Sequence, residues 1–188
     1  MIDRKIIDKK RVDEAKSRLE QFFQNNLVKK DENKAALFTY IKNSELSLKV
    51  AEKLMKDLEL KPYLWIVVCS YYSMFYIANA ILLKLGYKIG DEDVHRVTNE
   101  ALIALVFDRL KRGLLEEYEE TMENALEIAS IKAGELLENY EREKAKRKIF
   151  QYEMDEDIKK GKAETSLKRA KEFIFEIKKL IYDLEKGE

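Results

Sequence analysis

Apolar residues dominate one stretch of the chain, which runs from Trp65 to Leu85 and carries no charge between Trp65 and Leu83. Within it, apolar side chains recur at intervals of three and four residues, which predicts a helix. One stripe of this helix consists of Trp65, Val68, Tyr72, Phe75, Asn79 and Leu82, and a second consists of Val67, Tyr71, Met74, Ala78 and Ile81. Because both stripes are largely apolar, the helix either spans a membrane or forms the centre of a bundle.

The segment fits the centre of a bundle better than a membrane span. A span needs about 20 predominantly apolar residues, and this segment reaches that length only by including serine, asparagine and hydroxyl-bearing aromatic residues. Burial in a bundle requires hydrogen-bond partners for such polar groups, of which we single out Asn79, Ser73 and Tyr72 as a buried polar core. For the presence of Asn79 in an apolar helix, a hydrogen bond within the bundle and a bound ligand are equally good explanations.

The N-terminal half of the chain predicts two more helices. Residues 1–30 are highly charged with a rough apolar stripe, which we interpret as a helix packed on the side of the bundle or as an arm that binds a partner. Residues 32–58 keep helical spacing throughout. Since proline suits the first turn of a helix, Pro62 indicates that the central helix begins near Lys61, and Gly86 indicates its end. The short connection makes the second and central helices an antiparallel pair.

The C-terminal half of the chain predicts three helices separated by turns. A turn at residues 87–90 leads into a fourth helix, which Gly113 ends. A long helix with a nearly heptad apolar seam follows over residues 114–153. A turn at residues 159–162 then precedes a last amphipathic helix over residues 163–184.

Composition places the chain in the all-α class. Of its 188 residues 38% are charged, and one Pro and six Gly are few helix breakers for this length. We expect one domain, an up-and-down helical bundle of about five to six helices over residues 31–188, with residues 1–30 as an N-terminal helical extension. The 36 basic and 36 acidic residues cancel. This balance gives no overall attraction for nucleic acid and leaves formation of a homodimer electrostatically unopposed.

The residues needed for metal, disulfide and cofactor chemistry are scarce. A single Cys and a single His make neither an internal disulfide nor a metal site. Glycine-rich phosphate loops and nucleophile–histidine sets do not occur, so we expect no cofactor and no metal. The first residues lack the apolar core of a signal peptide, and we therefore expect a cytoplasmic protein without a membrane partner.

Several features occur in an order that is typical of one family. The central helix reads SYYSMFYIANAILLKLGY over residues 70–87, His95 begins the next helix after an acidic turn, and RKIFQY follows at residues 147–152 before the closing helix. In this pattern the chain resembles the HEPN superfamily, and in particular its small stand-alone prokaryotic and archaeal members. The resemblance extends over roughly residues 36–184 and implies a helical bundle that is frequently dimeric.

The resemblance also implies an activity and a partner. Active members are metal-independent ribonucleases, often toxins paired with a minimal nucleotidyltransferase antitoxin. Their motif is an Arg followed four to six residues later by a His: the Arg holds a phosphate, and the His moves the proton of a ribose 2′-hydroxyl. Here the motif reads Arg147-x4-Tyr152, and a tyrosine with a pKa of about 10 is a poor general base. The catalytic candidates are therefore Arg147, Tyr152 and His95, although His95 has no Arg in the six residues before it.

A basic cluster surrounds this altered motif. Its cations can neutralise phosphates and its tyrosine can stack on a base, which makes it the candidate site for nucleotide or RNA. The site consists of Arg142, Lys146, Arg147, Lys148 and Tyr152. The alternative is an ordinary helix face in contact with solvent.

These observations leave three functions open. The first is a HEPN-like dimeric binding module with a degenerate ribonuclease motif, whose ligand is a protein partner such as a minimal nucleotidyltransferase, or else nucleotide or RNA. The second is an active metal-independent endoribonuclease toxin of a toxin–antitoxin pair. The third is a structural helical protein that dimerises along residues 114–153.

Overall fold

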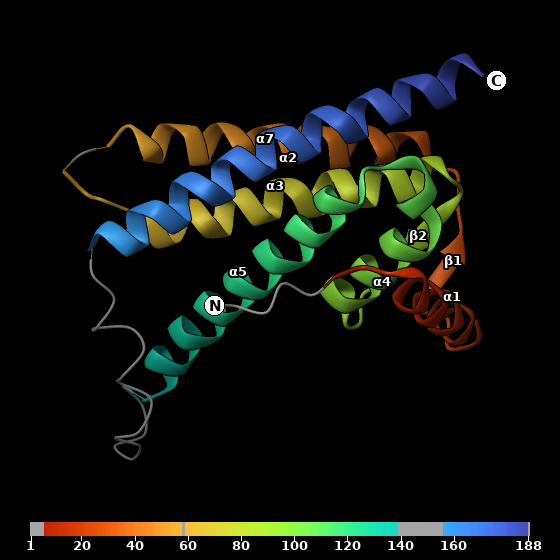
Figure 1. The fold of residues 1–188 in the computed structure, drawn as a ribbon, viewed down its shortest axis with the longest axis horizontal. Helices are drawn as coiled ribbons and strands as arrows, with labels where there is room; N and C mark the ends of the chain where they lie inside the picture. Colours follow the sequence, from red (N-terminus) through yellow and green to blue (C-terminus); the bar gives the residue numbers. More distant parts are fainter. Residues whose placement is uncertain (1–5, 58, 139–155, 188) are drawn as a thin grey trace.

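The structure, a computed structural model, describes residues 6–57, 59–138 and 156–187. It is mostly helical (81%), and the six α-helices of the described residues pack as a bundle, which confirms the predicted all-α class (Figure 1). These helices are α1 (Lys9–Gln24), α2 (Lys34–Met55), α3 (Tyr63–Lys84), α4 (Val94–Val106), α5 (Arg112–Glu138) and α7 (Glu156–Lys186). A short 3-10 helix, η1 (Phe107–Arg109), follows α4.

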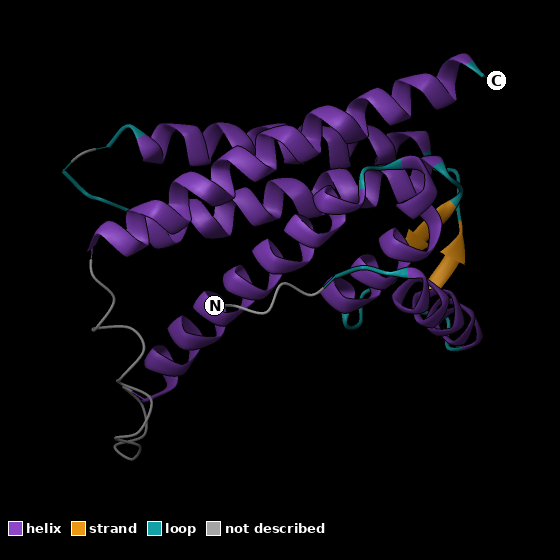
Figure 2. Ribbon diagram, viewed as in Figure 1, coloured by secondary structure: helices purple, strands orange, loops and turns teal. Residues whose placement is uncertain are grey.

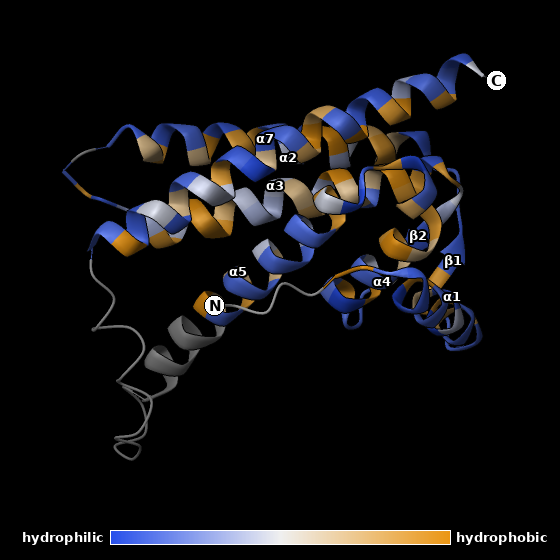
Figure 3. Cartoon of the chain, in the orientation of Figure 1, coloured by the Kyte–Doolittle hydropathy of each residue, from blue (hydrophilic) through white to orange (hydrophobic). Residues whose placement is uncertain are grey.

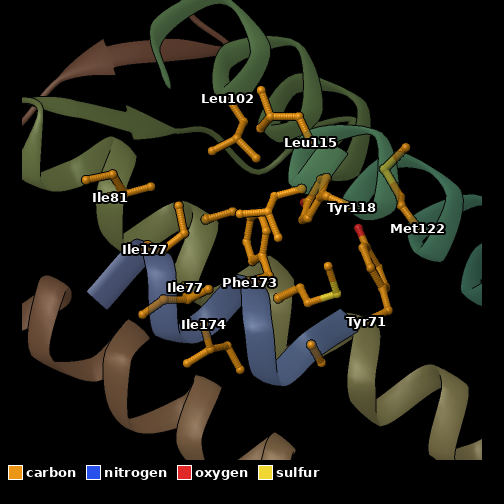
Figure 4. Close-up of a cluster of buried hydrophobic side chains, with 14 of the residues drawn as sticks. Tyr71, Ile77, Ile81, Leu102, Leu115, Tyr118, Met122, Phe173, Ile174 and Ile177 are labelled. Atoms are coloured by element: carbon orange, nitrogen blue, oxygen red, sulfur yellow. The ribbon is translucent and has the colours of Figure 1, made fainter. Parts of the chain in front are cut away.

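Helix α3 is the centre of the bundle, as its apolar pattern predicts. It packs against α2, α7, α5 and α4, and most of its residues are buried. Helix α2 runs antiparallel to it (Figure 1), and the Ser44 hydroxyl of α2 donates to the Ser73 carbonyl of α3 at 2.8 Å. On other sides, side chains of α5 and α7 meet those of α3 in the core (Figure 4), among them Tyr118, Phe173 and Ile177.

Among the described residues, α3 alone is long and apolar enough to cross a membrane. However, 72% of its most apolar window is buried inside the bundle. The central helix of a bundle needs the same length and composition, so the bundle accounts for the hydrophobicity of α3.

The two ends of α3 follow from a proline and a glycine. Pro62 occupies the N-cap position, one residue before the helix, so that α3 begins at Tyr63, near the predicted start at Lys61. Gly86 has a φ of 88°, the left-handed conformation expected for glycine after a helix. Its N–H donates to the carbonyl of Leu83 at 2.9 Å.

A short antiparallel ribbon joins two segments that the sequence pattern does not pair (Figure 2). Strand β1 (Val28–Lys30) lies beside strand β2 (Tyr87–Ile89), with Val28 opposite Ile89. Both of these side chains are buried, so hydrophobic contact fixes the ribbon from the inside. Because the strands are far apart in the sequence, no local pattern predicts their pairing.

The ribbon corrects two predicted boundaries. The helix predicted over residues 1–30 ends at Gln24, and Asn26 then turns the chain with a φ of 58°. Asparagine tolerates this left-handed conformation better than most residues do. The turn predicted at residues 87–90 is instead mostly strand β2.

Helix α1 packs on the bundle and does not project from it. Val12 and Ala15 are buried in the main core, and Leu19 and Phe22 are buried in a second cluster with residues of α4 and the ribbon. The remaining surface of α1 is mostly hydrophilic (Figure 3). The structure therefore supports the first interpretation of this segment, a helix packed on the side of the bundle.

One of the two breaks predicted at glycines is present and the other is not. The fourth helix ends before Gly113 as predicted, but the break lies at residues 107–111, because α4 ends at Val106 and α5 begins at Arg112. Gly161 lies within α7, which begins at Glu156, so the turn predicted at residues 159–162 is wrong. A glycine inside a helix costs about 1 kcal/mol relative to alanine, and the apolar contacts of this long helix outweigh that cost. Acidic residues in the first turn of α7 also favour its earlier start.

The apolar seam predicted over residues 114–153 faces the core of the same chain in the part that the structure describes. Leu115, Tyr118, Met122 and Ala125 of α5 are all buried there, and Figure 4 shows the first three of them in the core. Since these four side chains pack within one chain, they do not form an exposed seam for a second copy.

Candidate functional site

His95, the only histidine of the chain, lies in the first turn of α4 and packs against α3. Its half-buried ring contacts Phe75, Tyr71 and Tyr72, with ring centroids 4.8, 5.5 and 6.0 Å away. Asp93, the N-cap residue of α4, precedes it with a φ of 46°. The catalytic candidate of the sequence analysis thus lies in an aromatic cluster.

The hydroxyl of Tyr71 controls the state of His95. The Tyr71 oxygen lies 2.7 Å from Nδ1 of His95, and Tyr71 is fully buried. Burial raises the pKa of Tyr71 far above its ordinary value. Burial also lowers the pKa of His95, and the nearby charge of Asp93 opposes this effect only in part. At neutral pH the phenol is therefore protonated and the imidazole is neutral.

The Tyr71 hydroxyl lies between His95 and a second buried tyrosine. Tyr118 lies next to Tyr71 and is fully buried, and its hydroxyl has no hydrogen-bond partner among the described residues. The Tyr71 hydroxyl can donate to Nδ1 of His95 or accept from it, and the tautomer of the imidazole decides which. When Tyr71 donates, the other ring nitrogen, Nε2, carries the hydrogen and offers its surroundings a donor.

One stripe of α3 is only partly covered by the bundle. Trp65, Cys69, Tyr72 and Tyr76 follow one another at intervals of four, three and four residues, which places them on one side of the helix. Trp65 is 57% exposed and Tyr72 is 37% exposed. His95 borders this stripe through its contact with Tyr72. The prediction that Tyr72 belongs to the buried polar core is therefore wrong.

Two exposed apolar residues of α2 lie outside this stripe. Leu46 is 58% exposed and Val50 is 39% exposed. Ser44 of α2 lies opposite Ser73 of α3. Because each residue turns a helix by about 100°, Leu46 lies about 160° around α2 from Ser44 and points away from α3. We define the apolar face as the four residues Trp65, Cys69, Tyr72 and Tyr76.

Helix α7 packs on α2 and on α3 and leaves part of the apolar face open. Lys171 and Lys178 of α7 pair with Glu52 and Glu45 of α2. The described residues leave Trp65 57% exposed and Tyr72 37% exposed, whereas Cys69 and Tyr76 are half-buried.

Asn79 and Ser73, the other members of the predicted polar core, are buried as expected, with 5% and 0% exposed. The Asn79 amide donates to the Phe75 carbonyl at 2.9 Å and to the Thr98 hydroxyl at 3.3 Å. The Ser73 hydroxyl donates to the Ser70 carbonyl at 2.6 Å. These bonds stabilise α3 and join it to α4, so they account for both residues without a ligand.

A buried charge cluster that the sequence analysis missed joins α1 to α4 and α5. The Arg11 guanidinium donates to both carboxylate oxygens of Glu100 at 2.7 and 2.9 Å, and it reaches Glu119 at 3.3 Å. Arg18 also donates to Glu100 at 2.8 Å, and Asn99 donates to Glu119 at 3.0 Å. The signal in the sequence was Glu100, a charged residue within the apolar pattern of the fourth helix. Because two arginines balance two glutamates, the cluster anchors α1 and leaves no net charge for a ligand.

The remaining site predictions lie outside the described residues. They are Arg142, Lys146, Arg147, Lys148 and Tyr152. Of the three catalytic candidates, only His95 has described surroundings. Within the described ranges, no group of three or more His, Cys, Asp or Glu side chains could hold a metal ion.

Comparison with known proteins does not identify the chain. No family model, no curated protein and no solved structure matches it. Its function is therefore inferred from its own residues.

Proposed function

We propose that the chain is a binding module that holds a protein partner on its apolar face and does not hydrolyse RNA. One observation carries this proposal. The apolar face leaves 57% of Trp65 and 37% of Tyr72 exposed and carries no charge, and His95 at its edge is half-buried among aromatic rings.

A ribonuclease of the kind that the HEPN resemblance implies needs a base for the ribose 2′-hydroxyl. Such a base requires a free lone pair and a pKa near the working pH. Nδ1 of His95 is engaged by the Tyr71 hydroxyl, and burial lowers the pKa of His95. Burial raises the pKa of Tyr71, so the phenol does not replace it as a base. These properties favour binding over endoribonuclease activity.

The composition of the apolar face favours a protein partner over a nucleic acid. Trp and Tyr are enriched at protein interfaces, whose centres are poor in charged residues, and the face combines Trp65 and Tyr72 with no charged member. Nucleic acid instead requires cations that neutralise its phosphates. Neither the face nor the balanced charge of the whole chain supplies them. Binding of nucleotide or RNA by the basic cluster around Arg147 stays a prediction.

The proposal is tested by incubating end-labelled RNA with the purified chain in the presence of a metal chelator. We expect the wild type and the Arg147→Ala and His95→Ala variants to leave the RNA equally intact. Cleavage by the wild type that Arg147→Ala abolishes would overturn the proposal and favour the toxin.

Fluorescence of Trp65 provides a second measurement, because it is the only Trp and is 57% exposed. A protein that covers the apolar face should shift its emission to shorter wavelengths. Added RNA or ATP should leave the emission unchanged. The minimal nucleotidyltransferase that the HEPN resemblance implies is the first heterologous protein to test.

A further inference from the structure

We infer that the outer side of the α2–α7 pair docks on an anionic lipid surface, with both helices lying in the plane of the membrane. This side of the molecule is distinct from the apolar face of α3, so the inference goes beyond the proposed function and does not depend on it. The expectation of no membrane partner concerned signal peptides and spans, whereas docking at the surface of a bilayer requires neither.

One stripe of α2 points away from the bundle. Because each residue turns a helix by about 100°, the members of this stripe lie about 120–180° around α2 from Ser44. Ser44 itself faces α3, since its hydroxyl donates to the Ser73 carbonyl. The stripe therefore lies on the side of α2 opposite α3. All of its members are exposed, and they are Phe38, Lys42, Leu46, Lys49 and Lys53.

Two aromatic residues of α7 adjoin this stripe. Lys178 of α7 pairs with Glu45 of α2, and Phe175 and Tyr182 lie one turn before and one turn after Lys178. Both rings lie about 140–160° around α7 from the buried Ile177, so they point outward. Figure 1 shows α2 and α7 along the same long side of the bundle. We define the outer face as the stripe of α2 together with Phe175 and Tyr182.

The charges that α2 contributes to this side are all positive. Its two carboxylates, Glu45 and Glu52, are half-buried and pair with Lys178 and Lys171 of α7. Every exposed charged residue of α2 is instead a lysine, namely Lys34, Lys42, Lys49 and Lys53. Although the basic and acidic residues of the whole chain cancel, α2 therefore creates a local positive field.

The acidic residues of α7 lie mostly to the side of the outer face. In the part of α7 that runs beside α2, Glu172, Glu176 and Asp183 lie about 120–160° around the helix from Lys178. They are thus on the flank that is turned away from α2. Glu185 lies near the C-terminal end of α7, where the neighbouring Lys186 offsets its charge. The outer face consequently keeps its positive character.

Lysines interleaved with large apolar side chains suit a lipid surface. Lysine is attracted to anionic headgroups, and its long stem keeps the charge in water while neighbouring apolar groups enter the boundary of the acyl chains. Phe38, Leu46 and Phe175 supply these apolar groups and are 68%, 58% and 66% exposed. Tyr182, with the Lys186 ammonium 4.5 Å from its ring centroid, has the amphipathic character of residues at the headgroup level.

RNA or an acidic protein fits the outer face less well. Arginine binds phosphate and carboxylate groups in a fixed forked geometry, whereas lysine acts as a point charge, and the members of the outer face include no arginine. Arg169 of α7 turns instead toward α5, where it donates to Glu120 at 2.8 Å. Leu46 also offers no ring on which a base could stack. The composition of the face therefore favours lipid.

The first test mixes the purified full chain with vesicles of phosphatidylcholine, with or without phosphatidylglycerol, and measures the bound fraction by flotation. We expect binding to the anionic vesicles only, and salt should weaken it. The double variant Lys42→Ala/Lys53→Ala should lower the partition coefficient by about 30-fold, because each lysine near an anionic surface strengthens binding about fivefold. The matched variant Lys10→Ala/Lys16→Ala removes two exposed lysines of α1 and should have a much smaller effect.

The second test changes the apolar members of the face. Phe38→Ser and Phe175→Ser should each weaken binding to the anionic vesicles by about tenfold, because the rings no longer leave water. Ile158→Ser changes a residue of α7 that is 52% exposed and lies outside the outer face, and it should leave binding unchanged. Circular dichroism of each variant shows that the helices are retained. In a Trp65→Phe background, Phe38→Trp should emit at shorter wavelengths when the vesicles are added.

Several results would overturn the inference. One is a wild type that does not bind the anionic vesicles. Another is binding that the two lysine double variants weaken equally, since net charge and not the outer face would then cause it. Binding that both serine variants at the phenylalanines leave intact would also contradict insertion. Finally, RNA or polyglutamate that binds the wild type more tightly than the vesicles do, and loses affinity in Lys42→Ala/Lys53→Ala, would assign the face to nucleic acid or to an acidic protein.

Discussion

The junction of α1 with α4 and α5 and the seam between α2 and α7 are both held by charge pairs, but at different depths. At the junction, Glu100 is 4% exposed and binds Arg11 and Arg18. At the seam, the side chains of Lys178 and Glu45 are 40% and 45% exposed. A charge that loses its partner at the seam is solvated by water, whereas one at the junction is not. The same kind of contact should therefore contribute very differently to stability at the two places.

The largest effect is expected for Glu100→Gln, which keeps the shape of the side chain and removes its charge. The free energy of unfolding should fall by about 3 kcal/mol, because the Arg11 guanidinium loses its main partner while partly buried. Urea unfolding followed by circular dichroism measures this change. A loss below about 1 kcal/mol would show that Glu119 or water replaces the missing charge, and the contrast with the seam would disappear.

An intermediate effect is expected at His95, which is less buried than Glu100 at the junction and more buried than the Lys178–Glu45 pair at the seam. Burial lowers the pKa of His95 below its ordinary value of 6.5, so the unfolded chain binds the proton more readily than the folded chain. The His95 contribution to stability is therefore complete above pH 6.5 and is lost as the pH falls through the folded pKa. Thermal unfolding of the wild type and of His95→Gln at a series of pH values isolates this contribution. Equal pH dependence in the two proteins would show that His95 is solvated in the fold.

The smallest effect is expected for Lys178→Ala, which removes the pair with Glu45. The free energy of unfolding should change by less than about 0.5 kcal/mol, because both charges are already largely hydrated. Lys171→Ala, at the neighbouring pair with Glu52, serves as the matched variant. A loss as large as that of Glu100→Gln would mean that depth does not separate the two regions. Chemical unfolding under the same conditions gives the comparison.

The candidate site was only partly predictable from the sequence. The chain has one histidine, and its place at the head of the fourth helix is evident from the acidic residues before it. Its hydrogen bond to Tyr71 and its contact with Phe75 were not predictable, because they join residues more than 19 positions apart through the packing of α3 against α4. The helical spacing predicts a buried Tyr72, since an aromatic residue in an apolar stripe is usually part of a core. Its exposure depends on which side of α3 the other helices cover.

The sequence by itself determined the local facts of this protein: a helical chain, an apolar central helix, a glycine at the end of that helix, and the burial of Asn79 and Ser73. Each of these features depends on residues within about one helical turn of one another, and such local relations are visible in the periodicity of the sequence. Only the tertiary structure decided that Val28 pairs with Ile89, that Glu100 becomes buried between two arginines, and that Trp65 stays open to solvent. Periodicity predicts which residues lie on the same side of a helix. Which side becomes buried depends on where the other helices pack.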